Sequence, residues 1–96
     1  MGTLHLVNAA PGRSDALAAC LATLSAGDAL LLLEDGVQGA LGAHLDPLPA
    51  GVACHVLGPD VAARGLEARI DPSIARLDYA GFVAACAAHD RVVSWL

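Results

Sequence analysis

The chain has 96 residues and a net charge of −5, and its only basic residues are five arginines. Because these arginines are scattered, no basic stripe exists that would neutralise a run of phosphates, and direct nucleic-acid binding is not expected. The apolar run Ala29–Leu33 is far shorter than the roughly 20 residues of a membrane-spanning helix, and no signal-peptide pattern precedes it. We therefore expect a cytoplasmic protein without a membrane segment, folded as one domain over residues 1–96.

The apolar side chains are mostly small. Of the residues, 21 are Ala, and the aromatic ones are Tyr79, Phe82 and Trp95. Such side chains bury little area each, in a chain near the lower end of the lengths that fold alone. These features predict obligate association with a partner that buries further apolar surface.

The first third of the chain reads as a strand followed by a helix. Thr3–Asn8 is rich in β-prone residues and precedes a turn signal at residues 9–12. Ser14 is a candidate N-cap, and Gly27 is expected to close the helix. Apolar residues recur at helical spacing on one face between them: Leu17, Cys20, Leu21 and Leu24.

The middle of the chain contains an apolar run with no polar alternation. Ala29–Leu33 is therefore predicted to be a central strand that is covered on both faces, as in a parallel sheet. Asp35, with Gln38 three residues later, resembles a capping box and predicts a short helix to about Gly42. On this interpretation Asp35 is a helix cap rather than a catalytic residue.

The last half of the chain continues the alternation. Val52–Leu57 is predicted as a strand, and a short helix follows with Pro59 in its first turn and Gly65 just past its end. Residues 74–78 are predicted to form another strand, after which Asp78 caps a helix and residues 91–95 form the fifth strand. The alternation predicts a three-layer α/β fold with a mostly parallel sheet of about five strands flanked by helices.

The common catalytic and cofactor motifs are absent from the sequence. There is no GxGxxG, no GxxxxGK[ST] and no GxSxG. The histidines are far apart, and the adjacent Cys54 and His55 point to opposite faces of their strand, so neither a metal site nor a cofactor is expected. Polar residues follow the predicted strands at Asn8, Glu34 and Asp35, but Glu34 has no evident acid or base partner.

The chemistry that remains is thiol chemistry. Cys20, Cys54 and Cys86 are odd in number and widely spaced, which argues against a disulfide framework and a zinc site and favours a reducing compartment. Cys54 and Cys86 are expected to be inert core thiols. Cys20 lies in the middle of an apolar helical stripe, so a packing role is favoured over a reactive one, and both remain open.

Four segments carry a resemblance to a known family. These are LHLVNAAP, GDALLLLEDGVQGAL, VLGPDVAARGL and DYAGFVAACAAHDRVVSW, in that order along nearly the whole chain. Together they resemble the TusB/DsrH family of sulfur-relay subunits. The most specific of the shared stretches are LLLLEDGV and DVAARGL.

The resemblance implies a DsrE-like fold and a place as the smallest subunit of a heterohexamer with two homologous partners, of the TusC/DsrF and TusD/DsrE types. Such complexes pass persulfide sulfur, in one branch towards 2-thiouridine at the tRNA wobble position and in the other for dissimilatory sulfur oxidation. The principal sulfur-accepting cysteine belongs to a sister subunit, so this chain is not expected to be catalytic alone. Cys20 matches a cysteine on the first helix of DsrH-like members and is the candidate persulfide carrier. A purely structural, non-catalytic subunit is the alternative.

Overall fold

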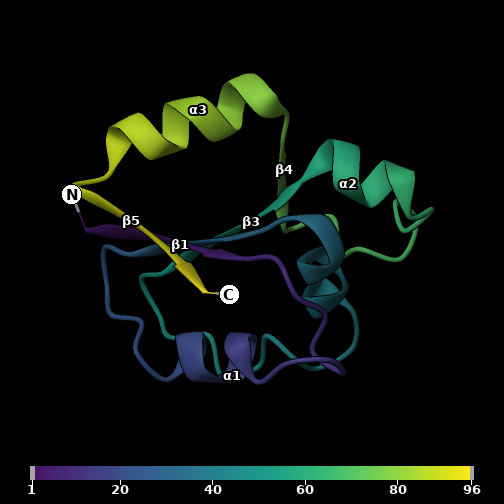
Figure 1. The fold of residues 1–96 in the computed structure, drawn as a ribbon, viewed down its shortest axis with the longest axis horizontal. Coiled ribbons are helices and arrows are strands. Elements are labelled where there is room, and N and C mark those ends of the chain that lie inside the picture. The colour runs from purple at the N-terminus through teal and green to yellow at the C-terminus, as the bar shows by residue number, and fades with distance from the viewer. Residues whose placement is uncertain (1, 96) are drawn as a thin grey trace.

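A computed structural model describes residues 2–95 and contains one five-stranded, all-parallel sheet with the strand order β4-β3-β2-β1-β5 (Figure 1). The strands are β1 (Thr3–Val7), β2 (Ala29–Leu32), β3 (Ala53–Leu57), β4 (Ala75–Leu77) and β5 (Arg91–Trp95). The helices are α1 (Ala16–Leu21), the 3-10 helix η1 (Glu34–Ala40), α2 (Gly58–Ala63) and α3 (Tyr79–Ala88). This arrangement confirms the predicted α/β fold with a parallel sheet of five strands.

The apolar run of the middle segment forms the central strand, as predicted. Every residue of β2 is buried, and β2 lies between β1 and β3. Successive side chains alternate between the two faces: Leu30 and Leu32 pack on the α1 side, and Leu31 packs on the α3 side. A strand that buries both faces needs no polar alternation, which explains the continuous run of leucines.

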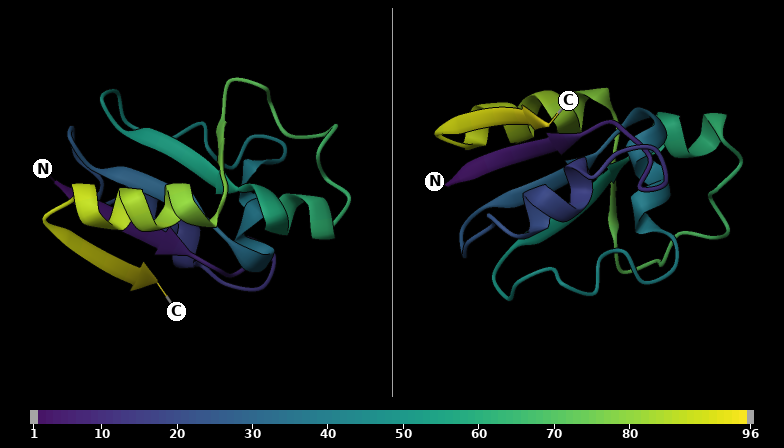
Figure 2. Two further views of the ribbon diagram at one scale, coloured as in Figure 1. Left: turned by 90° about the horizontal axis from the view of Figure 1, so that it is seen from above. Right: turned by 60° about the horizontal axis from the view of Figure 1, so that its bottom comes forward.

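Helices cover both faces of the sheet, and they do so unequally (Figure 2). One face lies against α1 and η1, and the main buried cluster forms there. Among residues 2–95, α3 alone crosses the opposite face of the sheet, and it has no buried residue of its own. The short helix α2 follows β3 directly and packs against η1, and its Val61 joins the main cluster.

The first helix is shorter than predicted. It spans Ala16–Leu21, with Asp15 at the N-cap position and no side-chain capping bond, while the Ser14 hydroxyl accepts from the Ala16 N–H at 3.0 Å. It ends early because the amide and the hydroxyl of Thr23 both donate to the Cys20 carbonyl, each at 2.9 Å, which competes with further α-helical bonding. Leu24 remains buried although it lies beyond the helix.

The capping role predicted for Asp35 is wrong. Asp35 lies inside η1, and Leu33, which occupies the N-cap position, makes no side-chain capping bond. The turn instead depends on backbone geometry: Glu34 has a left-handed φ of 50°, and Gly36 packs so closely on β1 that a Cβ would lie 2.1 Å from the Val7 carbonyl oxygen. The Gly in LLLLEDGV is therefore required by close packing.

Three other helix signals are confirmed. Pro59 lies in the first turn of α2, and Gly65 follows the helix with a positive φ of 66°. The carboxylate of Asp78 accepts a hydrogen bond from the Gly81 N–H at 2.7 Å at the start of α3. Across residues 2–95, none of the helices has both the length and the apolar character that crossing a membrane requires.

Candidate functional site

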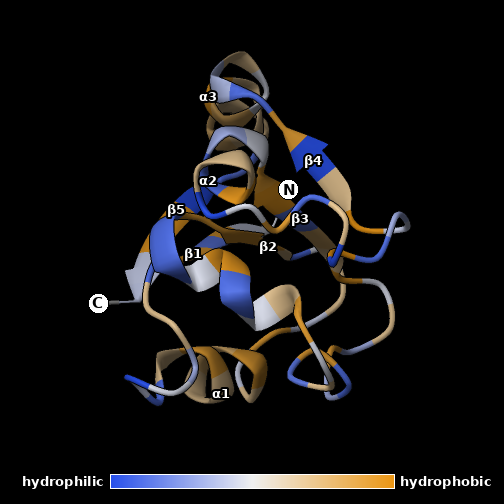
Figure 3. Cartoon of the chain, turned by 90° about the vertical axis from the view of Figure 1, so that its right-hand side faces the viewer, coloured by the Kyte–Doolittle hydropathy of each residue, from blue (hydrophilic) through white to orange (hydrophobic). Residues whose placement is uncertain are grey.

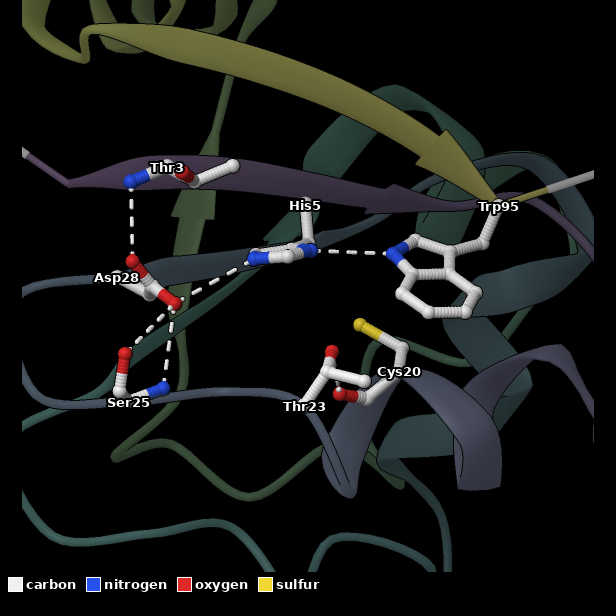
Figure 4. Close-up of polar contacts among 7 residues, drawn as sticks. All are labelled: Thr3, His5, Cys20, Thr23, Ser25, Asp28 and Trp95. Atoms are coloured by element: carbon white, nitrogen blue, oxygen red, sulfur yellow. Dashed lines mark hydrogen bonds and ion pairs between the residues drawn. The ribbon is translucent and has the colours of Figure 1, made fainter.

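Cys20 lies on the inner surface of α1 and is completely buried. Its sulfur atom points from the helix towards the space beside His5 and Trp95 (Figure 4). Trp95 packs against the same hydrophobic cluster that contains Cys20, and β5 contacts α1. The candidate thiol is therefore enclosed by α1 below and by β1 and β5 above.

A chain of polar side chains runs next to this thiol (Figure 4). The indole N–H of Trp95 donates to Nδ1 of His5 at 3.0 Å, and Nε2 of His5 lies 3.4 Å from a carboxylate oxygen of Asp28. The indole N–H is only a donor, so Nδ1 of His5 must be the unprotonated acceptor, and the proton of the neutral ring is on Nε2, facing Asp28. The chain therefore fixes both the orientation and the tautomer of His5.

Asp28 is anchored at the amino end of the sheet. Its carboxylate accepts from the backbone N–H of Thr3 at 3.0 Å and from that of Ser25 at 3.1 Å. These two bonds, the Thr3 bond first, lower the pKa of Asp28 from its usual 3.8. Asp28 therefore stays ionised at neutral pH and holds β1 next to the turn that precedes β2.

The surroundings of Cys20 oppose ionisation of its thiol. Burial, followed by the negative charge of Asp28, raises the pKa of Cys20 from 9.0 to about 11. At neutral pH the group is therefore almost entirely the protonated thiol, whereas the thiolate is the nucleophilic form. With the thiol covered in this way, Cys20 is a weak nucleophile.

The structure does not bring the three cysteines together at one site. Cys54 of β3 lies on the same face of the sheet as Cys20, and burial, followed by the charge of Cys20, raises its pKa to about 12. Cys86 lies on α3, on the opposite face. All three cysteines are free.

The residues that follow the strands form a second polar group. The amide of Asn8 donates to Glu34 at 3.3 Å, and the backbone N–H of Glu34 donates to the Asp60 carboxylate. Asp35 forms an ion pair with Arg64 at 2.9 Å. The last two contacts join η1, which contains Glu34 and Asp35, to α2 and the residue after it. The packing of η1 against α2 therefore explains where these carboxylates lie.

Among residues 2–95, no three His, Cys, Asp or Glu side chains are placed so that they could hold a metal ion. Cys54 and His55 point to opposite faces of β3: Cys54 packs in the main cluster, whereas His55 is level with Leu31 on the α3 side. The reactive groups of the site are therefore the hydrogen-bonded His5 and the buried thiol of Cys20.

The roles of His5, Asp28 and Trp95 were not predicted from the sequence. The available signal was that His5 alternates with Leu4 and Leu6, so it had to point to the other face of the first strand, towards the predicted first helix. What no local pattern shows is the partner, because His5 and Trp95 are 90 positions apart and meet only through the pairing of β1 with β5.

Comparisons with known proteins give the family of this chain. Residues 10–92 match a family described as DsrH like protein. The chain is 39% identical over 95 residues to Protein TusB of Escherichia coli O81 (strain ED1a), covering 96% of this chain and 99% of that protein. Protein TusB of Klebsiella pneumoniae (strain 342) gives the same identity and the same coverage.

A solved structure shows the same fold at a lower level of identity. The ychN protein from E. coli superposes with a TM-score of 0.77 and 19% identity, covering 98% of this chain and 99% of that one. This similarity supports the DsrE-like fold alone. With the family match over residues 10–92 and the 39% identity to Protein TusB, the chain belongs to the TusB/DsrH family of sulfur-relay subunits.

Proposed function

We propose that this chain is a subunit of a cytoplasmic complex that passes persulfide sulfur towards 2-thiouridine at the wobble position of tRNA. The observation that carries the proposal is the 39% identity to Protein TusB over nearly the full length of both chains. The proposed partners are two homologous DsrE-like subunits, one of the TusC/DsrF type and one of the TusD/DsrE type, in a heterohexamer. This chain contributes structure to the complex and does not act as an enzyme by itself.

The surface of α3 supports association. This helix has no charged residue, and Tyr79 and Val83 are 59% and 67% exposed. Figure 3 shows mostly hydrophobic colours along α3, although the helix lies on the outside of the chain. A helix that is apolar on all sides is normally buried, so an isolated chain leaves unfavourable surface in water.

Cys20 supports a second candidate function, in dissimilatory sulfur oxidation. DsrH-like members carry a cysteine on the first helix, and Cys20 lies on α1. Should Cys20 carry sulfur in either pathway, its thiolate would attack the outer sulfur of a donor persulfide. The donor's S–S bond would break, the donor would leave as a thiolate, and Cys20 would hold the transferred sulfur as a persulfide. The proton of the Cys20 thiol would pass to solvent.

The complete burial of Cys20 and its raised pKa favour the structural role. In that case Cys20→Ala costs packing only, and sulfur flux through the assembled complex is unchanged. In the carrier case, the variant assembles normally and loses its own persulfide, with partial loss of flux because the main acceptor lies in a sister chain. Mass spectrometry of Cys20 after incubation with a persulfurated donor distinguishes the two roles.

The pathway is tested in a bacterium that lacks its own TusB. The chain is expressed there together with its two sister subunits, and 2-thiouridine is measured in hydrolysed tRNA by mass spectrometry. Restored 2-thiouridine supports the proposal. If the three chains assemble while 2-thiouridine stays absent, the proposal for tRNA fails, and sulfur oxidation becomes the function to measure.

The isolated chain is expected to bind no tRNA. Its net charge of −5 repels the phosphate backbone, and its five arginines are scattered along the sequence. A gel-shift titration with the pure chain at low salt measures this. Tight binding that weakens steeply with added salt would contradict the expectation.

A further inference from the structure

We infer that Trp95 is a gate over the Cys20 thiol, held closed by its hydrogen bond to His5, and that displacement of the indole is what admits a reactant to Cys20. The inference rests on the proposed function only for the identity of the reactant, a persulfide donor. The gate itself is a property of this chain and is argued from its own contacts.

The Cys20 thiol is enclosed by the protein. Cys20 has no exposed surface, and its sulfur faces His5 and Trp95 instead of solvent (Figure 4). Trp95 packs on the same cluster. A reagent larger than water therefore has no path to the sulfur until part of this enclosure moves.

The residues around the thiol differ in how firmly the fold holds them. His5 belongs to β1, which is paired on both sides, and the neighbouring core leucines Leu30 and Leu32 belong to the central strand. Trp95 belongs to β5, an edge strand paired only with β1, and its side chain is half-buried. Edge strands that bury few side chains open at lower free energy than central ones. Among the strand residues around the thiol, Trp95 is therefore the one that moves most readily.

A hydrogen bond to His5 holds the Trp95 side chain in place. The side chain of Trp95 makes one hydrogen bond, from its indole N–H to His5 Nδ1 at 3.0 Å, and the two rings lie 6.2 Å apart between centroids. The Asp28 carboxylate holds Nε2 of His5. Because the imidazole ring is fixed in this way, its Nδ1 stays directed at the indole N–H of Trp95. Asp28 is in turn fixed by the backbone of Thr3 and Ser25. His5 is thus a positioning residue, and Trp95 is the moving part.

Opening would change the chemistry of Cys20 as well as its access. Burial is the main reason that its pKa is raised to about 11, so water that enters beside the sulfur moves this pKa back towards 9. One displacement therefore both exposes the thiol and increases the fraction of thiolate. The closed state, by contrast, protects Cys20 from reactants that do not displace Trp95.

The experiment measures the labelling rate of each cysteine in the full chain with iodoacetamide at neutral pH, read by mass spectrometry of the peptides. Trp95→Phe removes the N–H donor and keeps an aromatic ring. We expect Cys20 to be labelled about twofold to twelvefold faster in this variant, the factor that corresponds to the loss of one net hydrogen bond. Trp95→Ala removes the cover as well and is expected to increase the rate further.

The chain contains its own controls. Cys86 lies on the opposite face of the sheet from Cys20, so its rate is expected to stay unchanged. Tyr79→Phe removes a polar group from an exposed aromatic residue elsewhere and is expected to alter no rate. The gate is refuted if Trp95→Phe leaves the Cys20 rate unchanged, if all three cysteines become faster together, or if Tyr79→Phe has the same effect. No persulfide donor is present, so this outcome is independent of the 2-thiouridine measurement that tests the proposed function.

Discussion

The two faces of the sheet differ in how completely this chain covers them. The face that α1 and η1 cover holds a continuous cluster that includes Val7, Leu30 and Val56, all fully buried. On the face that α3 covers, the buried residues belong to the sheet itself, chiefly Leu4 and Leu31, and none of the residues of α3 is buried. One face is therefore complete within the chain, whereas the other exposes apolar side chains.

The direction of the chain explains this difference. The connections β1–β2, β2–β3 and β3–β4 each lead to the next strand in the same direction across the sheet. Because crossovers between parallel strands are right-handed, all three connections lie on one face of the sheet. Within the described part of the chain, the return from β4 to β5 is the one connection that crosses the other face, so α3 has to cover five strands there. Its small residues fill little of that area, which is why Phe82 and Cys86 remain half-buried.

The largest expected effect comes from a truncation in the packed face. Leu32 is completely buried, and Leu32→Ala is expected to lower the free energy of unfolding by about 2–5 kcal/mol, through lost burial and the cavity left behind. Val83→Ala on α3 is expected to change it by no more than about 0.5 kcal/mol because that side chain is largely exposed. Urea unfolding of the full-length chain measures both. Equal losses would show that α3 is packed as tightly as the other face.

A polar residue of the packed face comes next. Asp28→Ala removes the acceptor for two backbone N–H groups and for His5, and is expected to cost about 1–3 kcal/mol. Asp46→Ala removes the same charge from an exposed loop and serves as the matched control. The difference in urea midpoint between the two variants isolates the hydrogen bonds from the change in net charge. If both variants behave alike, Asp28 does not anchor the face.

The local signals of the sequence predicted the strands, the fold class and the caps at Asp78 and Gly65, because the alternation, the apolar run and the turn residues each act over a few positions. They failed where a contact between distant segments decides the structure. Asp35 matched a cap pattern, yet the close packing of Gly36 on β1 set the turn. Likewise, Cys20 was placed correctly on an apolar stripe, but its cover by Trp95 depends on a strand pairing that only the fold reveals.

The packed face is expected to weaken at alkaline pH. The pKa of Cys20 is raised to about 11 and that of Cys54 to about 12, against 9.0 for an unperturbed thiol. Above pH 9 the unfolded chain therefore releases protons that the folded chain retains, and stability is lost as pH rises, by up to about 1.4 kcal/mol per pH unit for each thiol. Urea midpoints at pH 8, 9 and 10 should fall less steeply in the Cys20→Ala, Cys54→Ala double variant than in the unchanged chain. Cys86→Ala, on the other face, should retain the full slope, and a flattened slope in this control would contradict the assignment.

The α3 face is expected to respond at the opposite end of the pH scale, with a smaller effect. Burial, followed by the charge of His89, lowers the pKa of His55 from 6.5, and its buried Nδ1 has no hydrogen-bond partner among residues 2–95. As pH falls below 6.5 the unfolded chain binds a proton that folded His55 resists, so stability present above pH 6.5 is lost on acidification. His55→Gln cannot titrate, so its urea midpoint should fall less between pH 7 and 5.5 than that of the unchanged chain, while the exposed control His44→Gln should follow the unchanged chain. The effect is small because His55 is only half-buried and water screens part of the cost. Parallel slopes for His55→Gln and the unchanged chain would mean that water already reaches His55, and that α3 covers the sheet less than the static contacts indicate.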